Sequence, residues 1–346
     1  MKVYAGMDPR LPLADVAAHA RRIESLGYDG LHVAETIHDP FMVSLLALQA
    51  TTSLTVRTAV ALAFTRSPML TALTAWDLSV LSNGRFHLGL GSQIRQNIEG
   101  RYGMPWAEPI GRMRDYLEAV EACFSSFASG DPLKHVGPHY QLTRLQPYFN
   151  PGPSPEVAIP PLYLGGVNPR ICQLAGEVAD GFVTHPTNSS PLYLERSCLP
   201  HLLQGLAAAG RERSSLELVV GTQVITGHNA EALDQERERQ RRLFAFLYST
   251  PAYAPTLELY GWAHLTSELR SVVRDNAWDR LEYLVTNDIL DTLLPTGRID
   301  ELAALLLDRG TGLADFGTRP KYCTTSCLAV TLSKSPTSTT VAFSGT

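Results

Sequence analysis

Gly165 and Gly166 are followed closely by an Asn-Pro-Arg triplet, a pattern that suits anion binding. Glycines allow a ligand to approach the main chain, because no Cβ stands in the way. Asn168 is a good N-cap for a helix that begins at Pro169. The free N–H groups of that helix start, together with Arg170, suit a phosphate group. An ordinary tight turn between a strand and a helix fits the same residues, so the sequence leaves both interpretations open.

Polar residues also follow two earlier segments that we predict to be strands. Glu35 lies at the end of one, and His38 comes three residues later. A carboxylate and an imidazole at such positions are the groups that proton transfer requires, although single residues of these types are often structural. Gly91 and Ser92 end another glycine-rich strand whose spacing is not a phosphate fingerprint. We take Glu35 and His38 as catalytic candidates, and Gly91 and Ser92 as candidate cofactor contacts.

The elements that would position these residues alternate between strand and helix patterns. Residues 2–6 predict a strand, and residues 13–26 repeat apolar side chains at helical spacing. Residues 54–64 are mostly apolar and rich in Val, Thr and Ala, as in a strand buried on both faces of a parallel sheet. Repeated βα units predict a parallel α/β sheet, closed as a barrel or left open. No Gly-x-Gly-x-x-Gly follows the first predicted strand, which disfavours a dinucleotide-binding fold.

Three longer segments complete the predicted organisation. Residues 109–127 predict a helix, and residues 230–294 predict mainly helices. Residues 131–160 are rich in Pro, Gly and aromatic residues, so we interpret them as an insertion, with residues 139–142 as one arm of a hairpin. In a (β/α)8 barrel the active site lies at the carboxyl ends of the strands, where the candidates above would meet.

Composition excludes several kinds of partner. The 346 residues carry 29 Lys and Arg against 34 Asp and Glu, a formal net charge of −5. The one basic run, residues 237–242, is typical of a solvated helix face, so we expect no nucleic-acid partner. No segment approaches the ~20 apolar residues that span a bilayer, and we see no signal peptide. The 5 cysteines form no disulfide framework and no metal-ligand pattern, which favours a cytoplasmic enzyme without a metal site.

Longer segments of the sequence match a known family. The chain resembles the luciferase-like monooxygenase superfamily over about residues 1–315, and most closely its branch of coenzyme F-420-dependent oxidoreductases. The matching segments are LGYDGLHVAETIHDPF (26–41), RTAVALAFTRSPMLTALTAWDLSVLSNGRFHLGLGSQ (57–93), YGMPW (102–106), GRMRDYLEAV (111–120), PLYLGGVNPRICQLAGEVADGF (161–182) and STPAYAPTLELYGW (249–262).

The resemblance implies a (β/α)8 TIM barrel with an insertion before strand five. It also implies a non-proline cis peptide between Ala59 and Val60, at the end of strand three, under the cofactor ring. Glu35 matches the acidic position that ends strand two. Several relatives carry a His directly after that acid, where this chain has Thr36, so a proton-transfer role does not carry over to that position.

The resemblance also implies a cofactor and a reaction. It assigns Gly165, Gly166, Asn168 and Arg170 to the cofactor phosphate. The implied activity is hydride transfer between an organic small-molecule substrate and the deazaflavin F-420. An FMN-dependent two-component monooxygenase and a non-catalytic flavin-binding barrel are the alternatives. For the oligomeric state, the sequence is compatible with a homodimer.

Residues 316–346 depart from the family pattern and form a divergent tail. They are rich in Ser and Thr and contain no acidic residue. The strand-like segment in them is residues 327–332, which comes late for an eighth strand. We therefore expect an imperfect barrel seam, where the eighth strand should pair with strands one and seven. We also expect a disordered C-terminal end from about Ser333 and a lower stability than in intact relatives.

Overall fold

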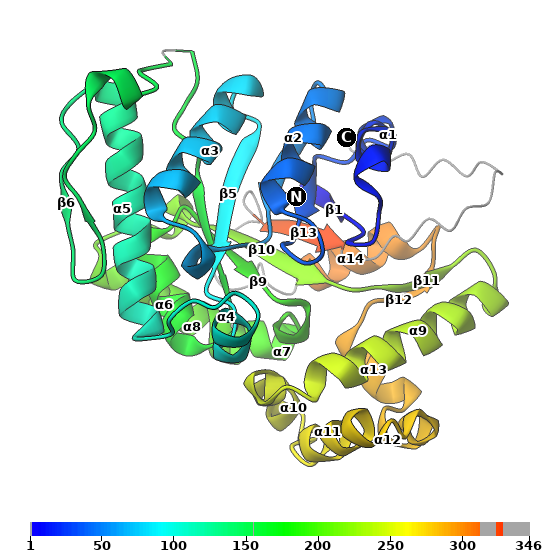
Figure 1. The fold of residues 1–346 in the computed structure, drawn as a ribbon. Coiled ribbons are helices and arrows are strands. Elements are labelled where there is room, and N and C mark those ends of the chain that lie inside the picture. Colours follow the sequence, from blue (N-terminus) through cyan, green and yellow to red (C-terminus); the bar gives the residue numbers. More distant parts are fainter. Residues whose placement is uncertain (1, 155, 312–322, 328–346) are drawn as a thin grey trace.

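A closed barrel of parallel strands forms the centre of the protein (Figure 1). The structure is a computed structural model that describes residues 2–154, 156–311 and 323–327. The strands, in chain order, are β1 (Lys2–Gly6), β2 (Gly30–Val33), β3 (Thr55–Thr58) continued by β4 (Ala61–Leu62), β5 (Phe86–Gly91), β8 (Leu162–Gly166), β9 (Gly181–Thr184), β10 (Glu217–Thr222) and β13 (Cys323–Cys327). Pairing of β3 with both β2 and β5 closes the ring. The predicted TIM-barrel fold is confirmed.

Helices surround the barrel and begin where the sequence places proline after a capping residue. The side chains of Asp39, Ser67 and Asn168 each accept a hydrogen bond from a main-chain N–H in the first turn of their helices. Proline at the first helical position needs no such partner. The outer helices are α1 (Leu13–Ser25), α2 (Pro40–Ala50), α3 (Pro68–Leu81), α5 (Pro109–Ser129), α6 (Pro169–Val178), α8 (Leu199–Ala208) and α14 (Leu302–Thr311).

The predicted insertion precedes the fifth barrel strand, β8. It contains an antiparallel hairpin of β6 (His135–Val136) and β7 (Gln141–Leu142). The short helix α4 (Arg95–Gly100) lies between β5 and α5.

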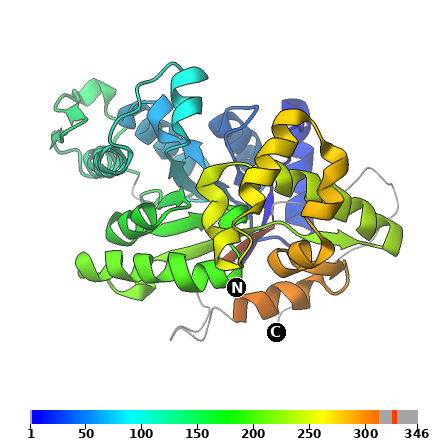
Figure 2. The same cartoon turned by 90° about the horizontal axis from the view of Figure 1, so that it is seen from below.

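A helical layer follows β10, as expected from residues 230–294. Its helices have a hydrophobic core of their own, separate from that of the barrel. The layer lies to one side of the strands in Figure 1 and in front of them when the molecule is viewed from below (Figure 2). It consists of α9 (Ala230–Tyr248), α10 (Ala254–Leu259), α11 (Leu265–Asp275), α12 (Leu281–Leu284) and α13 (Asn287–Leu293), with the parallel pair β11 (Ile225–Gly227) and β12 (Thr296–Arg298) at its base.

Six strands contribute polar side chains to a connected layer inside the barrel: Tyr4, His32, Arg57, His87, Tyr163 and Glu217. Arg57 is fully buried and donates to His32 Nε2 at 3.3 Å, to His87 Nδ1 at 3.2 Å and to Glu217 Oε1 at 3.3 Å. Its guanidinium carbon lies 3.8 Å from the ring centroid of Tyr163, whose hydroxyl donates to the same glutamate. Since an arginine side chain only donates, both histidines accept as neutral rings. Burial and the charge of Arg57 lower the pKa of His87 to about 3, and that of His32 well below its usual value.

The eighth strand differs from our expectation. It comes at Cys323–Cys327 and not at residues 327–332, and it pairs with β1 on one side and β10 on the other. The predicted imperfect seam is therefore wrong for this strand. An apolar run does not mark this strand, because strand pairing uses main-chain groups and Thr residues favour strands. The predicted end without order from about Ser333 lies outside the described residues. No helix among the described residues is long and apolar enough to cross a membrane.

Candidate active site

Strand three is interrupted at the carboxyl-end mouth of the barrel, between β3 and β4. The Ala59–Val60 peptide is cis, which confirms the prediction. Both residues are partly exposed, whereas the flanking segments Val56–Thr58 and Ala61–Phe64 are buried. This pair is therefore the partly exposed part of strand three, although the Ala59 N–H and the Val60 carbonyl are both hydrogen-bonded.

The side chain of Val60 packs against two of the glycines that the sequence singled out. A Cβ on Gly165 would lie 2.5 Å from Val60 Cγ1, and one on Gly91 would lie 2.6 Å from Val60 Cγ2. Gly166 is also closely packed, because a Cβ there would lie 2.2 Å from Ile171 Cγ2. These positions require glycine even without a ligand, so packing explains what the sequence left open.

This packing predicts the result of a double substitution at Gly165 and Val60. We expect Gly165→Ala to lower the free energy of unfolding by about 1–3 kcal/mol, the usual cost of overpacking. Adding Val60→Ala removes the colliding methyl groups, so the double variant should recover most of that loss. Urea unfolding of the wild type, both single variants and the double variant gives the coupling. Equal destabilisation with and without Val60→Ala would contradict the packing role.

The turn after β8 leaves a cation free at the start of α6. Asn168 accepts from the N–H of Ile171 at 3.0 Å and is the N-cap, as predicted. Arg170 is exposed and has neither an ion pair nor a hydrogen bond with the described residues. The main-chain N–H groups of a first helical turn have no intrahelical acceptor. Pro169 has no N–H, and the N–H groups of Ile171 and Cys172 are bonded to Asn168, so the turn offers a phosphate the N–H and the positive charge of Arg170.

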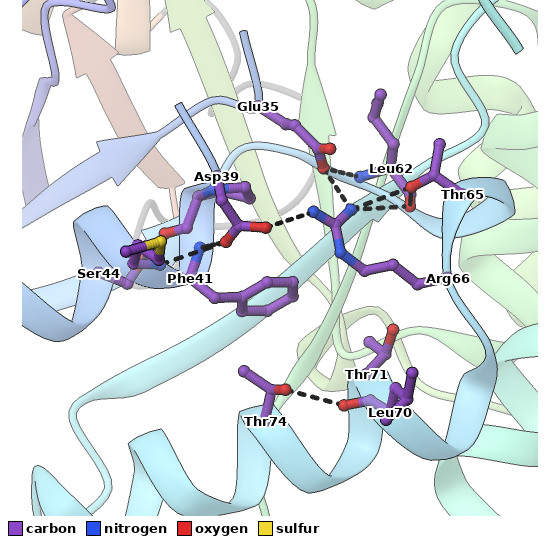
Figure 3. Close-up of polar contacts among 12 residues, drawn as sticks. Glu35, Asp39, Phe41, Ser44, Leu62, Thr65, Arg66, Leu70, Thr71 and Thr74 are labelled. Atoms are coloured by element: carbon purple, nitrogen blue, oxygen red, sulfur yellow. Dashed lines mark hydrogen bonds and ion pairs between the residues drawn. The ribbon is translucent and has the colours of Figure 1, made fainter. Parts of the chain in front are cut away.

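The carboxylate of Glu35 is held beside β4. Its Oε2 accepts from the main-chain N–H of Leu62 at 2.8 Å and from Arg66 Nη1 at 2.7 Å (Figure 3). The Glu35 side chain is only 7% exposed. This predicted catalytic residue is therefore an ion-pair partner in the structure.

Arg66 joins Glu35 to the start of α2. Its Nη2 donates to Asp39 Oδ2 at 2.7 Å, while Asp39 Oδ1 caps α2 (Figure 3). Burial opposes the charge of Arg66, but the hydrogen bonds to both carboxylates outweigh it and raise the pKa of the guanidinium. Arg66 was not among our predicted site residues. Its place directly after strand three was the available signal.

The predicted catalytic His38 lies between β2 and α2, in the segment that Glu35 and Asp39 bracket. It is half-buried and makes no hydrogen bond with the described residues. Its catalytic role stays a prediction. Ser92, the remaining predicted contact, follows β5 and donates from its hydroxyl to the carbonyl of Gln93 at 3.2 Å.

A histidine outside our predicted set lies at the end of β9. The ring of His185 stacks on Tyr253 from the helical layer, with centroids 4.7 Å apart. Burial lowers the pKa of His185 to about 4, so its ring is neutral near pH 7. This contact brings the helical layer to the carboxyl ends of the strands.

The sequence that forms this barrel, its interrupted third strand and the turn before α6 matches a known protein family. The family model of the luciferase-like monooxygenases matches residues 3–315. The chain belongs to this family.

Individual proteins are similar to this chain in sequence or in fold. An uncharacterized protein of Mycobacterium tuberculosis is 37% identical over 311 residues, which cover 89% of this chain and 91% of that protein. The coenzyme F-420-dependent tetrahydromethanopterin reductase of Methanopyrus kandleri has a similar structure, with a TM-score of 0.76 at 18% identity over 94% of this chain and 92% of that one. The oxygenating constituent of 3,6-diketocamphane monooxygenase from Pseudomonas putida, solved with FMN, gives a TM-score of 0.64 at 17% identity over 95% and 92%.

Proposed function

We propose that the protein is an oxidoreductase that transfers a hydride between a small organic substrate and coenzyme F-420. The observation that carries this proposal is the continuity between two parts of the mouth. Val60 is partly exposed and packs against Gly165 at the end of β8, so a flat ring would lie on its remaining exposed surface. The same strand end leads into the turn where Arg170 has no ion pair with the described residues.

These residues fit a phosphate-bearing cofactor with a flat ring. Arg170 and the first turn of α6 would bind the phosphate, and Ala59 with Val60 would support the ring. Hydride chemistry is supplied by the cofactor when it is bound, while the protein orients it and excludes water. F-420 is favoured because the structural relative with a TM-score of 0.76 is an F-420-dependent reductase.

Arg170 is expected to contribute directly to cofactor affinity. Replacing it with alanine should raise the dissociation constant for F-420 by about 10- to 150-fold, which corresponds to about 1.5–3 kcal/mol for charge-assisted hydrogen bonds. Arg242→Ala, which removes another exposed arginine from α9, is the control and should leave the constant unchanged. An unchanged affinity in Arg170→Ala would contradict the phosphate assignment.

An FMN-dependent monooxygenase is the second candidate, favoured by the similarity to an FMN-bound oxygenase. Titration of the purified protein with F-420 and with FMN separates the two. We expect tighter binding of F-420. Tighter binding of FMN with flavin-dependent oxygen consumption would support the second candidate, and bound cofactor without turnover across a substrate panel would support a non-catalytic barrel.

We also propose a homodimer, formed through the outer faces of α2 and α3. These two helices are neighbours in Figure 1. Their sequences contain a single charged residue, Asp77. Met42 is 56% exposed and Leu70 is 60% exposed, so apolar surface remains uncovered. We expect light scattering to give twice the chain mass, and Met42→Lys with Leu70→Lys to give a monomer. Tyr283→Lys, on exposed α12, is the control and should stay dimeric; a monomeric wild type would contradict the proposal.

A further inference from the structure

The Arg66 side chain connects the end of strand three to the loop between β2 and α2 at the mouth of the barrel. Nη1 contacts Glu35 at the end of β2 and the hydroxyl of Thr65 at 3.0 Å, and Nη2 contacts Asp39 before α2. The side chains of Arg66 and Glu35 are only 20% and 7% exposed. Charge-assisted bonds with so little solvent are stronger than exposed ion pairs.

Glu35 replaces a strand contact that the interruption of strand three removes. At the start of the interruption, the N–H of Ala59 donates to the Val33 carbonyl at 2.8 Å. Within it, the N–H of Glu35 donates to the Val60 carbonyl at 3.1 Å. Beyond it, the N–H of Leu62 has the Glu35 carboxylate as its acceptor. A side chain therefore completes a ladder that main-chain carbonyls make elsewhere in the barrel.

The placement of Val60 depends on this ladder. Val60 is held between the Glu35 N–H on one side and the glycines at the ends of β5 and β8 on the other. If the carboxylate moves, the Leu62 end of the segment loses its attachment to β2. The ion pair with Arg66 keeps the carboxylate in place because it fixes the rotamer that reaches Leu62.

We propose that Arg66 is a positioning residue for the cofactor site: it holds the Glu35 carboxylate on the Leu62 N–H and so fixes Val60 at the barrel mouth. In this account Glu35 acts through the main chain and does not transfer a proton. The link to the cofactor rests on the proposed function, whereas the link to Leu62 does not.

Amide hydrogen exchange of peptides that cover residues 59–65 tests the structural step without any cofactor. Arg66→Met and Glu35→Ala should raise the exchange rate of the Leu62 amide by about tenfold or more, because its acceptor is displaced or lost. Glu35→Gln keeps an acceptor oxygen and should restore protection. Asp39→Asn is the matched control, since it removes the other carboxylate of Arg66 but keeps a good N-cap, and it should leave this amide protected.

Two exchange results would overturn the proposal. One is wild-type protection in both Arg66→Met and Glu35→Ala. The other is an equal loss in Asp39→Asn, which would indicate a general loosening of the loop. If Arg66→Met does not fold, Arg66→Lys, which keeps the charge but not the two-pronged geometry, should show an intermediate exchange rate.

Cofactor titration then tests the functional step. Arg66→Met and Glu35→Ala should raise the dissociation constant for F-420 by about tenfold and shift the absorbance band of the bound cofactor, while Asp39→Asn and Glu35→Gln should do neither. A wild type that binds neither F-420 nor FMN would defeat the proposed function and leave the exchange result to decide the role of Arg66. Faster exchange with unchanged affinity and an unchanged band would show that Arg66 has no positioning role for the cofactor.

Discussion

Replacing Arg57 with methionine is expected to lower the free energy of unfolding by about 3–5 kcal/mol, the cost of breaking a buried ion pair from one side. The substitution removes the cation that Glu217 and two neutral histidines face inside the barrel. Methionine fills a similar volume, so it leaves little cavity. The lost free energy of unfolding therefore comes mainly from the missing charge and its hydrogen bonds. Urea unfolding followed by circular dichroism measures the change.

Arg114 gives a matched control for this experiment. It pairs with Glu177 across the outer helices α5 and α6, and its side chain is 39% exposed. Arg114→Met should cost less than about 1 kcal/mol, as exposed pairs do. Equal losses in the two variants would show that the interior position of Arg57 adds nothing.

Acidification is expected to destabilise the protein through the buried histidines of the same layer. The pKa of His87 is lowered to about 3 from a usual value of 6.5, so the unfolded chain binds a proton before the folded one does. The stability that this histidine contributes is therefore complete above pH 6.5 and declines as the pH falls toward 3. The slope is at most about 1.4 kcal/mol per pH unit for each such group, and His32 acts in the same direction.

Unfolding free energies at pH 7.5, 6.5, 5.5 and 4.5, chosen roughly to bracket the histidine range, would measure this slope. Glu and Asp residues also contribute at the acid end, so the comparison with a variant is decisive. His87→Gln keeps an acceptor for Arg57 and removes the titrating ring, and the slope between pH 6.5 and 4.5 should become shallower. The same slope in both proteins would contradict the assignment.

The sequence predicted the barrel because its elements carry local signals. Proline after Asp39, Ser67 and Asn168 marks helix starts, and apolar runs between them mark strands. The cis peptide at Ala59–Val60 came from the family resemblance and not from residue chemistry. These features depend on residues that are close together in the chain.

Contacts between residues far apart in the sequence could not be predicted from these local signals. Arg57 lies in a run that looked simply apolar, and its partner Glu217 comes 160 residues later, so no local pattern reveals the polar layer. Glu35 looked like a free acid because its partner Arg66 lies 31 residues away and beyond an interrupted strand. The eighth strand has few apolar residues, so no apolar run marks it in the sequence. Its place is set by main-chain pairing with β1 and β10.

The position of that strand also governs how the chain can fold during synthesis. Lys2 pairs with Thr324, so one side of the first barrel strand must wait for a segment that the ribosome makes more than 300 residues later. Until then β1 and β10 expose unpaired main-chain groups, which are sites for strand addition by other chains. Closing so long a loop makes the last pairing slow, because few local contacts assist it. Nascent chains of this protein should therefore depend on chaperones more than helical proteins of the same length do.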